Sequence, residues 1–253
     1  INPLLQKEGD LIRSLNCDPY PYGGRRKRSG YTTFLGTMPN GSAVNNLLEW
    51  HQNNGTQFWT YAFAGGNLYY STQGTGDWTI CGGGTLTAGT QVGHAVLNNT
   101  LIIGDGAAAT RHSTNGTSFT NTTAAPVAAH FAQYQHRIQA SGTSTLVYSV
   151  TDDPTNWATS GTSDSSSVVI PGAGNINRVF VTNDRTIISK NSGIMFSWDM
   201  FNLVQIPTNQ GPTAPYSLGQ TEDYWFYLNR NGYFGFNGDR PELISNPIER
   251  QIY

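Results

Sequence analysis

The sequence predicts an all-β protein, a β-propeller of four-stranded blades with five or six blades, and three observations lead to this expectation. Glycine (29 residues) and proline (12) are abundant while charged residues make up only 12%, a balance typical of strands and turns. Phe, Tyr and Trp make up a further 12%, and such large flat side chains suit packed sheet faces. A strand and turn unit also recurs every 36 to 42 residues, close to the length of a four-stranded blade.

The repeated unit is an apolar or aromatic strand that runs into a polar turn, as in "NLYYSTQGTGDW" and "TLVYSVTDDPTNW". Five units are visible, and their spacings are 42, 36, 40 and 40 residues when they are aligned on Ser71, Ser113, Ser149, Ser189 and Asn229. A sixth unit is predicted from "GYTTFLG" (residues 30–36) and "ELISNPIE" (residues 242–249), which would close a ring by strand sharing.

Short alternating runs bounded by Gly, Asn, Asp or Pro predict the individual strands. In the first unit these are residues 47–51, 57–63, 68–71 and 77–80, and in the second unit residues 94–97, 100–104, 110–113 and 118–121. We expect residues 25–253 to form the propeller as a single domain. Residues 1–24 are expected to be an N-terminal arm and lead-in.

The turn "STNGTSF" at residues 113–119 resembles the Asp-box of sialidase-like propellers, with its Asp and Trp replaced. In those proteins the box is a hairpin on the outer rim and has no catalytic part. The turn therefore favours the propeller architecture and predicts no activity.

The sequence favours a non-enzymatic protein with no catalytic residue, no metal site and no cofactor. A glycosidase needs two opposed carboxylates, but the 16 acidic residues are scattered, mostly in turns where Asp caps its own backbone. The five histidines lack metal-ligand spacing, two cysteines are too few for a four-ligand zinc site, and no glycine-rich phosphate motif is present. A degenerate glycosidase stays an alternative.

One run of charge stands out on a chain whose net charge is -2: Arg25, Arg26, Lys27 and Arg28 hold four of the 14 basic residues. We interpret this run either as a solvated loop or as a basic loop that contacts DNA phosphates or an acidic partner. No apolar stretch is long enough to span a membrane.

The two ends of the chain carry motifs of a known family. The segment "GDLIRSLNCDPYPYGGRRKRSGYTTFLG" has an Asn-Cys pair, a basic stretch that ends in Arg-x-Gly, and an apolar strand. The segment "NRNGYFGFNGDRPELISNPIE" has a Gly-containing turn and an Ile-Ser-x-x-Ile-Glu stretch. Both resemble the tail hub, or nozzle, proteins of short-tailed bacteriophages, also described as packaged-DNA-stabilisation proteins. The matching residues are Asn16, Cys17, Arg28, Gly30, Phe34, Ile244, Ser245, Ile248 and Glu249.

The resemblance implies a virion structural protein in a phage tail, a subunit of a hexameric ring at the DNA channel. Its partners would be copies of itself and other tail, portal or neck proteins, and the run from Arg25 to Arg28 would contact packaged DNA or an acidic neighbour. Members of the family continue beyond the Ile-Glu stretch, whereas this chain stops at Tyr253. It is therefore either a compact relative or part of a longer protein.

A second hypothesis is a carbohydrate-binding propeller, either lectin-like or receptor-reading. Trp78, Phe119 and Trp157 stand at equivalent turn positions and would stack on sugar rings. The alternative for the same three residues is packing against a neighbouring strand.

Overall fold

The structure is a computed structural model that describes residues 17–19, 25–27 and 36–245, except 53, 54, 56, 73–75, 160–163, 183, 222 and 223. All five four-stranded sheets fall in one compact unit, Leu35–Ile244. Strands β1 (Cys17–Pro19) and β2 (Arg25–Lys27) pair with each other in a second unit. The domain boundary expected at residue 25 stays a prediction.

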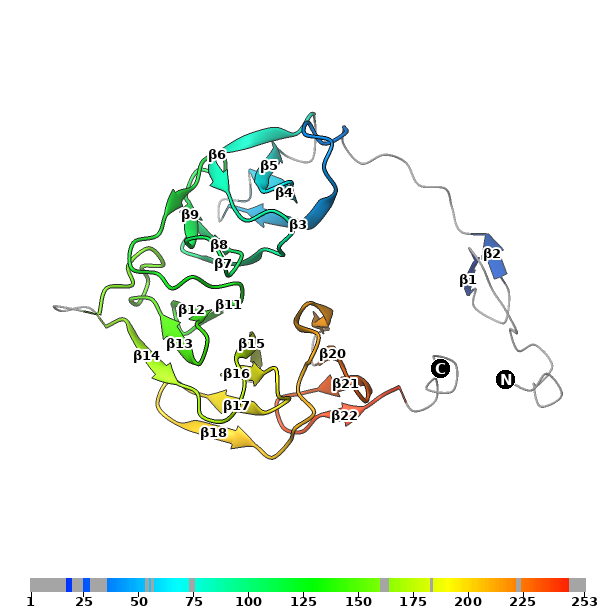
Figure 1. Cartoon of the computed structure of the whole chain (residues 1–253), viewed down its shortest axis with the longest axis vertical. Helices are drawn as coiled ribbons and strands as arrows, with labels where there is room; N and C mark the ends of the chain where they lie inside the picture. Colours follow the sequence, from blue (N-terminus) through cyan, green and yellow to red (C-terminus); the bar gives the residue numbers. More distant parts are fainter. Residues whose placement is uncertain are drawn as a thin grey trace. The chain divides into compact units, whose positions relative to one another are not determined.

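The fold is all-β, and each sheet consists of four antiparallel strands that are consecutive in the chain, which confirms the predicted fold class (Figure 1). A single 3-10 turn, η3 (Pro215–Ser217), precedes the fifth sheet among the described residues. The strands are β3 (Val44–His51), β4 (Phe58–Ala64), β5 (Asn67–Thr72), β6 (Thr79–Thr85), β7 (Gly93–Leu97), β8 (Thr100–Gly104), β9 (Arg111–Ser113), β10 (Thr120–Asn121), β11 (Phe131–Tyr134), β12 (Arg137–Ser141), β13 (Thr145–Tyr148), β14 (Ser166–Val169), β15 (Ile176–Thr182), β16 (Arg185–Lys190), β17 (Met195–Trp198), β18 (Leu203–Ile206), β19 (Gly219–Gln220), β20 (Trp225–Asn229), β21 (Gly232–Phe236) and β22 (Glu242–Leu243).

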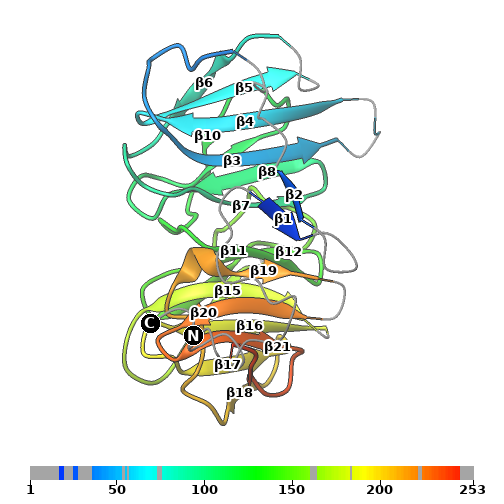
Figure 2. The same cartoon turned by 90° about the vertical axis from the view of Figure 1, so that its right-hand side faces the viewer.

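The sheets follow one another around an arc, with the first strand of each sheet on the inner side (Figure 1). Strand β11 contacts both β7 and β15, so the inner strands of neighbouring sheets adjoin. Figure 2 looks onto this inner side, where β3, β7, β11 and β15 succeed one another. Residues far apart in the sequence are brought together there.

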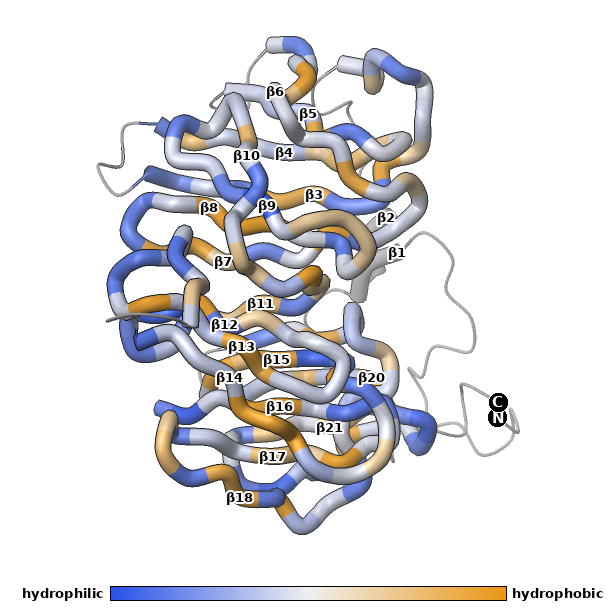
Figure 3. The backbone as a smooth tube through the Cα atoms, turned by 60° about the vertical axis from the view of Figure 1, so that its left-hand side comes forward, coloured by the Kyte–Doolittle hydropathy of each residue, from blue (hydrophilic) through white to orange (hydrophobic). Residues whose placement is uncertain are grey.

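Hydrophobic clusters join each sheet to the next, from the first through to the fifth. All residues of strand β8 are buried, because its two faces pack against two different neighbouring sheets. Leu101 and Ile103 pack on the first sheet, while Ile102 between them packs on the third. This is the alternation that a strand covered on both faces requires. Figure 3 shows the hydrophobic colour along the second strands of sheets, such as β8 and β16, and the hydrophilic colour in many of the turns.

Five repeated units are confirmed, and the proposed composition of a sixth is corrected in part. Glu242 and Leu243 form β22, which pairs with β21 as the fourth strand of the fifth sheet. They are therefore not available to a further blade. Residues 30–35 and 246–249 of the predicted sixth unit lie outside the described residues. None of the hydrophobic clusters formed by the described residues joins the fifth sheet to the first.

The turn at residues 113–119 joins β9 to β10 and is held by its own side chains. Asn115 Oδ1 accepts the backbone N–H groups of Thr117 and Ser118, both at 3.0 Å, as an aspartate would in such a turn. Gly116 has φ of 79°, and a Cβ there would lie 2.2 Å from the Trp59 ring. The turn thus has a structural role, as the sequence predicts.

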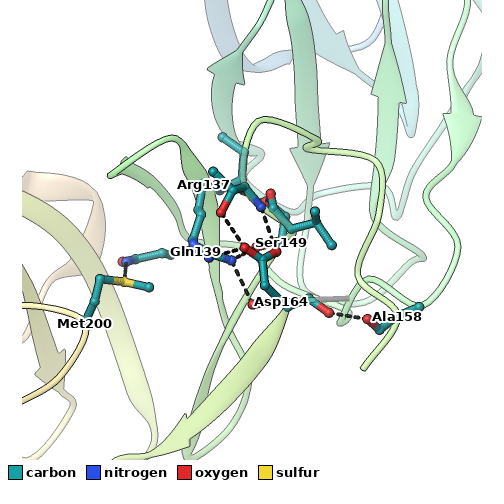
Figure 4. A network of polar contacts seen from close by, with 10 residues as sticks. Arg137, Gln139, Ser149, Ala158, Asp164 and Met200 are labelled. Atoms are coloured by element: carbon teal, nitrogen blue, oxygen red, sulfur yellow. Dashed lines mark hydrogen bonds and ion pairs between the residues drawn. The ribbon is translucent and has the colours of Figure 1, made fainter. Parts of the chain in front are cut away.

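An ion-pair network ties the third sheet to the loop before β14 (Figure 4). Arg137 Nη2 donates to Asp164 Oδ2 at 2.6 Å, and Arg137 Nη1 donates to the carbonyl of Ser149 at 2.9 Å. The hydroxyl and N–H of Thr151 also donate to the Asp164 carboxylate. These Thr151 and Arg137 hydrogen bonds lower the pKa of Asp164 to about 2.

A buried lysine holds the connection between the third and fourth sheets. Lys190, at the end of β16, is 1% exposed. Its Nζ donates to three carbonyl oxygens, those of Ile170 at 2.9 Å, Pro171 at 3.0 Å and Gly172 at 2.5 Å. All three hydrogens of the ammonium are therefore used. Burial lowers the pKa of Lys190, and the carbonyl oxygens oppose that effect.

Candidate functional site

A cavity of about 210 Å³ opens where the inner strands converge. Its lining comes from four sheets and from the turn before the fifth, and we call it the polar cavity. The residues that matter for its chemistry are Asn46 on β3, His94 on β7, Phe131 on β11, Arg178 on β15 and Tyr216 on η3.

Two glycines allow the second and third sheets to approach closely enough to form this wall. A Cβ at Gly93 would lie 2.0 Å from the carbonyl oxygen of Ala129, and one at Gly104 would lie 2.3 Å from that of Ala128. Both neighbours are backbone atoms and cannot move aside alone. The approach therefore requires glycine at both positions.

Arg178 is the cation of the polar cavity, and it has no carboxylate partner in the part of the chain that the structure describes. Its Nη1 donates to His130 Nδ1 over a long 3.5 Å, and its Nε is buried without an acceptor. Burial lowers the pKa of Arg178, yet a guanidinium keeps its proton at any physiological pH. The wall of the cavity thus carries a positive charge that is not neutralised locally.

The histidines beside Arg178 stay neutral near pH 7. Burial, and then the charge of Arg178, lower the pKa of His130 to about 4 and lower that of His94 as well. Burial raises the pKa of Tyr216, so its hydroxyl keeps its proton. Tyr216 and His94 are only partly desolvated, because each also has exposed surface, and this leaves the polar cavity open to solvent. The site therefore offers one cation and several neutral hydrogen-bonding groups.

A second cavity of about 380 Å³ shares Phe131 and Arg178 with the first, and we call it the apolar cavity. Val179, Phe180 and Trp225 line it together with other residues of the inner strands. Arg178 consequently lines both a polar and a largely apolar space. Such an arrangement suits a ligand with one charged end and one apolar end.

The basic run predicted as a loop is in part a strand, which is a correction. Residues Arg25–Lys27 form β2, and the register sets Lys27 opposite Cys17 and Arg26 opposite Asp18. The backbone pairing explains the difference, because hydrophilic side chains do not prevent a short hairpin from forming. Arg28 lies outside the described residues.

The three residues of the carbohydrate hypothesis are packing residues. Trp78, Phe119 and Trp157 are 8%, 3% and 2% exposed. Trp78 Nε1 donates to the carbonyl of Gly36 and Trp157 Nε1 to that of Pro154, while Phe119 meets Tyr61 edge to face. No ring face is left for a sugar, so their burial removes them from the candidate stacking residues.

Sequence reasoning missed the polar cavity, because its residues belong to different repeat units. A signal was present at Arg178, the one charged residue in the largely apolar strand "INRVFV". A charge on a strand covered by neighbouring sheets demands a partner or a ligand.

Other classes of site were sought in the same described ranges. No three His, Cys, Asp or Glu side chains there are grouped so that they could hold a metal ion. Cys81 is buried and free, and burial raises the pKa of its thiol to about 12. Among these residues no helix has the length and apolar character needed to cross a membrane.

Comparison with known proteins identifies the fold and no family. No protein-family model matches the chain, and no curated protein matches it. Among solved structures, Raptor of Chaetomium thermophilum aligns with TM-score 0.54 at 11% identity, over 80% of this chain and 20% of Raptor. PorZ, a bacterial surface component of the type-IX secretion system of Porphyromonas gingivalis, aligns with TM-score 0.51 at 13% identity, over 84% of this chain and 29% of PorZ. The Pan2 WD40 domain of Neurospora crassa aligns with TM-score 0.50 at 7% identity, over 79% and 64%.

The chain thus spans less than a third of Raptor and of PorZ. At these identities the likeness shows a propeller-like fold alone, since one fold serves many functions.

Proposed function

We propose that this chain is a non-enzymatic virion structural protein, a ring-forming subunit of the tail hub, nozzle or neck of a short-tailed bacteriophage. In this role it helps to close the DNA channel and to retain packaged DNA. The proposal is supported by the resemblance at both ends of the chain, residues 9–36 and 229–249. The propeller-like fold of the five sheets is the one that the resemblance implies.

The observation that carries the proposal is the hairpin of β1 and β2. Its strands hold Cys17 and the run Arg25–Lys27, which belong to the two motifs of the N-terminal resemblance, and they pair directly. The hairpin falls outside the compact unit of the five sheets. A segment outside a propeller is suited to contact another subunit or DNA, and adjacent cations favour phosphate.

The partners in this proposal are copies of the same chain and other phage tail, portal or neck proteins. Rings of identical subunits repeat one interface around an axis, so one basic hairpin per subunit becomes a ring of basic hairpins. A hexamer of the 27.6 kDa chain is the assembly that the resemblance implies.

The experiment compares two triple variants with the same change in charge, in particles assembled with this chain. Both the number of particles and the DNA that each retains are measured. Serine replaces Arg25, Arg26 and Lys27 in one variant, and three exposed arginines of the sheets, Arg185, Arg230 and Arg240, in the control.

We expect the hairpin variant to lose packaged DNA or to assemble poorly, and the control to behave like the wild type. Unchanged assembly and DNA retention in the hairpin variant would contradict the role of the basic run. An equal loss in both variants would assign the effect to net charge.

A further inference from the structure

The unneutralised charge of Arg178 is the feature of the propeller that most needs a partner. Its Nε is buried without an acceptor, and its only hydrogen bond within the described chain is the 3.5 Å contact with His130. A partly buried charge without a counter-ion is costly unless something binds it. Nε itself is closed to solvent, so an anion that enters the open polar cavity would meet the outer, Nη side of the guanidinium.

The charge of the wall sets the charge of the anion. Since His94 and His130 stay neutral near pH 7, Arg178 supplies one positive charge. Asn46 adds an amide, whose Nδ2 also donates to the carbonyl of Val92, and Tyr216 adds a hydroxyl at the same wall. One cation with neutral hydrogen-bonding groups matches a monoanion better than a dianion such as sulfate.

One carboxylate of the protein itself acts on this wall without neutralising it. The negative charge of Asp105 contributes to the raised pKa of Tyr216, so Asp105 has an electrostatic effect on the wall of the cavity. Its oxygens, however, accept the N–H groups of Thr87, Ala107 and Ala108 at 2.6, 2.9 and 2.7 Å. Those hydrogen bonds fix Asp105 in its own turn, and it makes no ion pair with Arg178.

The shape of the guanidinium and the polarity of the two cavities restrict the chemical class of the ligand further. The planar guanidinium matches the two oxygens of a carboxylate in a fork of parallel hydrogen bonds. The apolar cavity begins at the same residue, with Phe131 shared between the two spaces and Trp225 beyond it. The polar cavity of about 210 Å³ accommodates a small organic head group.

We propose that the propeller binds a small monocarboxylate, with its carboxylate on Arg178 in the polar cavity and its short apolar chain against Phe131 in the apolar cavity. The site is separate from the assembly role proposed above, and its test needs only the isolated chain. Acetate, butyrate and hexanoate serve as probes.

The first experiment is calorimetric titration of the full chain with the three sodium carboxylates at constant ionic strength. We expect saturable binding that tightens by up to about fourfold for each added CH₂, as the chain enters the apolar cavity. Sodium sulfate and chloride are the anion controls and should bind more weakly than butyrate. Affinity that does not rise with chain length, or sulfate that binds as tightly as butyrate, would overturn the proposal.

The second experiment compares Arg178→Gln with Arg185→Gln, an exposed arginine at the start of β16. We expect the affinity for butyrate to fall at least about tenfold in Arg178→Gln and to stay unchanged in the control. Equal affinity in the two variants would overturn the assignment to Arg178.

A measurement on the wild type covers the case in which Arg178→Gln fails to fold. The side-chain Nε–H resonances of the arginines are followed by NMR while butyrate is added. The Arg178 resonance should move in a saturable manner and that of Arg185 should not. Uniform small shifts of all arginines would mean that butyrate has no site here.

Discussion

Replacing Lys190 with methionine tests whether the buried ammonium stabilises the connection between the third and fourth sheets. Methionine keeps an unbranched apolar stem of similar length and removes the charge. The three carbonyl oxygens of residues 170–172 then lose their donor. Hydrogen bonds to a charged group contribute about 1.5–3 kcal/mol each. The variant also escapes the cost of burying an ammonium, which is several kcal/mol.

The balance is a net loss of about 1–3 kcal/mol in the free energy of unfolding, because the carbonyl of the buried Ile170 is left without a donor, whereas Pro171 and Gly172 are exposed to water. For a chain of this size one kcal/mol shifts the melting temperature by about 2–4 °C, so we expect a fall of about 2–12 °C. The assay is thermal unfolding followed by circular dichroism. Arg185→Met is the matched control, since it removes one exposed positive charge from the same strand. A melting temperature for Lys190→Met within about 1 °C of that control would refute the reasoning.

Three further predictions concern the stability of the five-sheet unit. Gly104→Ala should lower the free energy of unfolding by about 1–3 kcal/mol, because its Cβ would overpack the third sheet. Gly219→Ala, with nothing within 4 Å of its Cβ, should be neutral or slightly stabilising. Equal urea midpoints for the two variants would contradict this prediction. The pKa of His130 is about 4 in the folded protein, below the unfolded value of about 6.5, so the unfolded state takes up the proton first. The free energy of unfolding therefore falls as pH falls from about 6.5 to 4. His130→Gln should make this dependence on pH less steep, and an unchanged dependence would show that His130 does not cause it. The pKa of Asp164 is about 2, so its contribution is present above the unfolded value of about 3.9 and is lost as pH falls toward 2. Because Asp164 is exposed, this contribution to the free energy of unfolding is about 1 kcal/mol or less. The difference in unfolding free energy between the wild type and Asp164→Asn should disappear over that pH range. A difference that stays constant with pH would argue against the ion pair.

The strands were predictable from the sequence because their pattern is local. Alternating apolar runs bounded by turn residues marked residues 94–97 and 100–104, and the structure has strands at Gly93–Leu97 and Thr100–Gly104. The turn around Asn115 was predictable for the same reason, since its hydrogen bonds lie within a few residues. The strand at Arg25–Lys27 was missed, because charge alone suggested a solvated loop.

The candidate site was not predictable in the same way. Arg178 and His94 are 84 residues apart, and only the packing of successive sheets brings them to one cavity. The packing of Trp157 was one of the two interpretations that the sequence allowed, and the structure selects it, with the indole N–H donating to the carbonyl of Pro154. Patterns of a single strand carry no information about which sheet lies opposite.

The proposed role in a phage tail is tested most directly by a cryo-EM map of the native particle that contains this chain. The account predicts a ring of copies around the DNA axis, with five four-stranded sheets in each subunit. It also predicts that the hairpin of Cys17–Pro19 and Arg25–Lys27 lies against DNA or an acidic surface of a neighbouring protein. A map that places the chain away from the DNA axis, or as single copies without a ring, would contradict it.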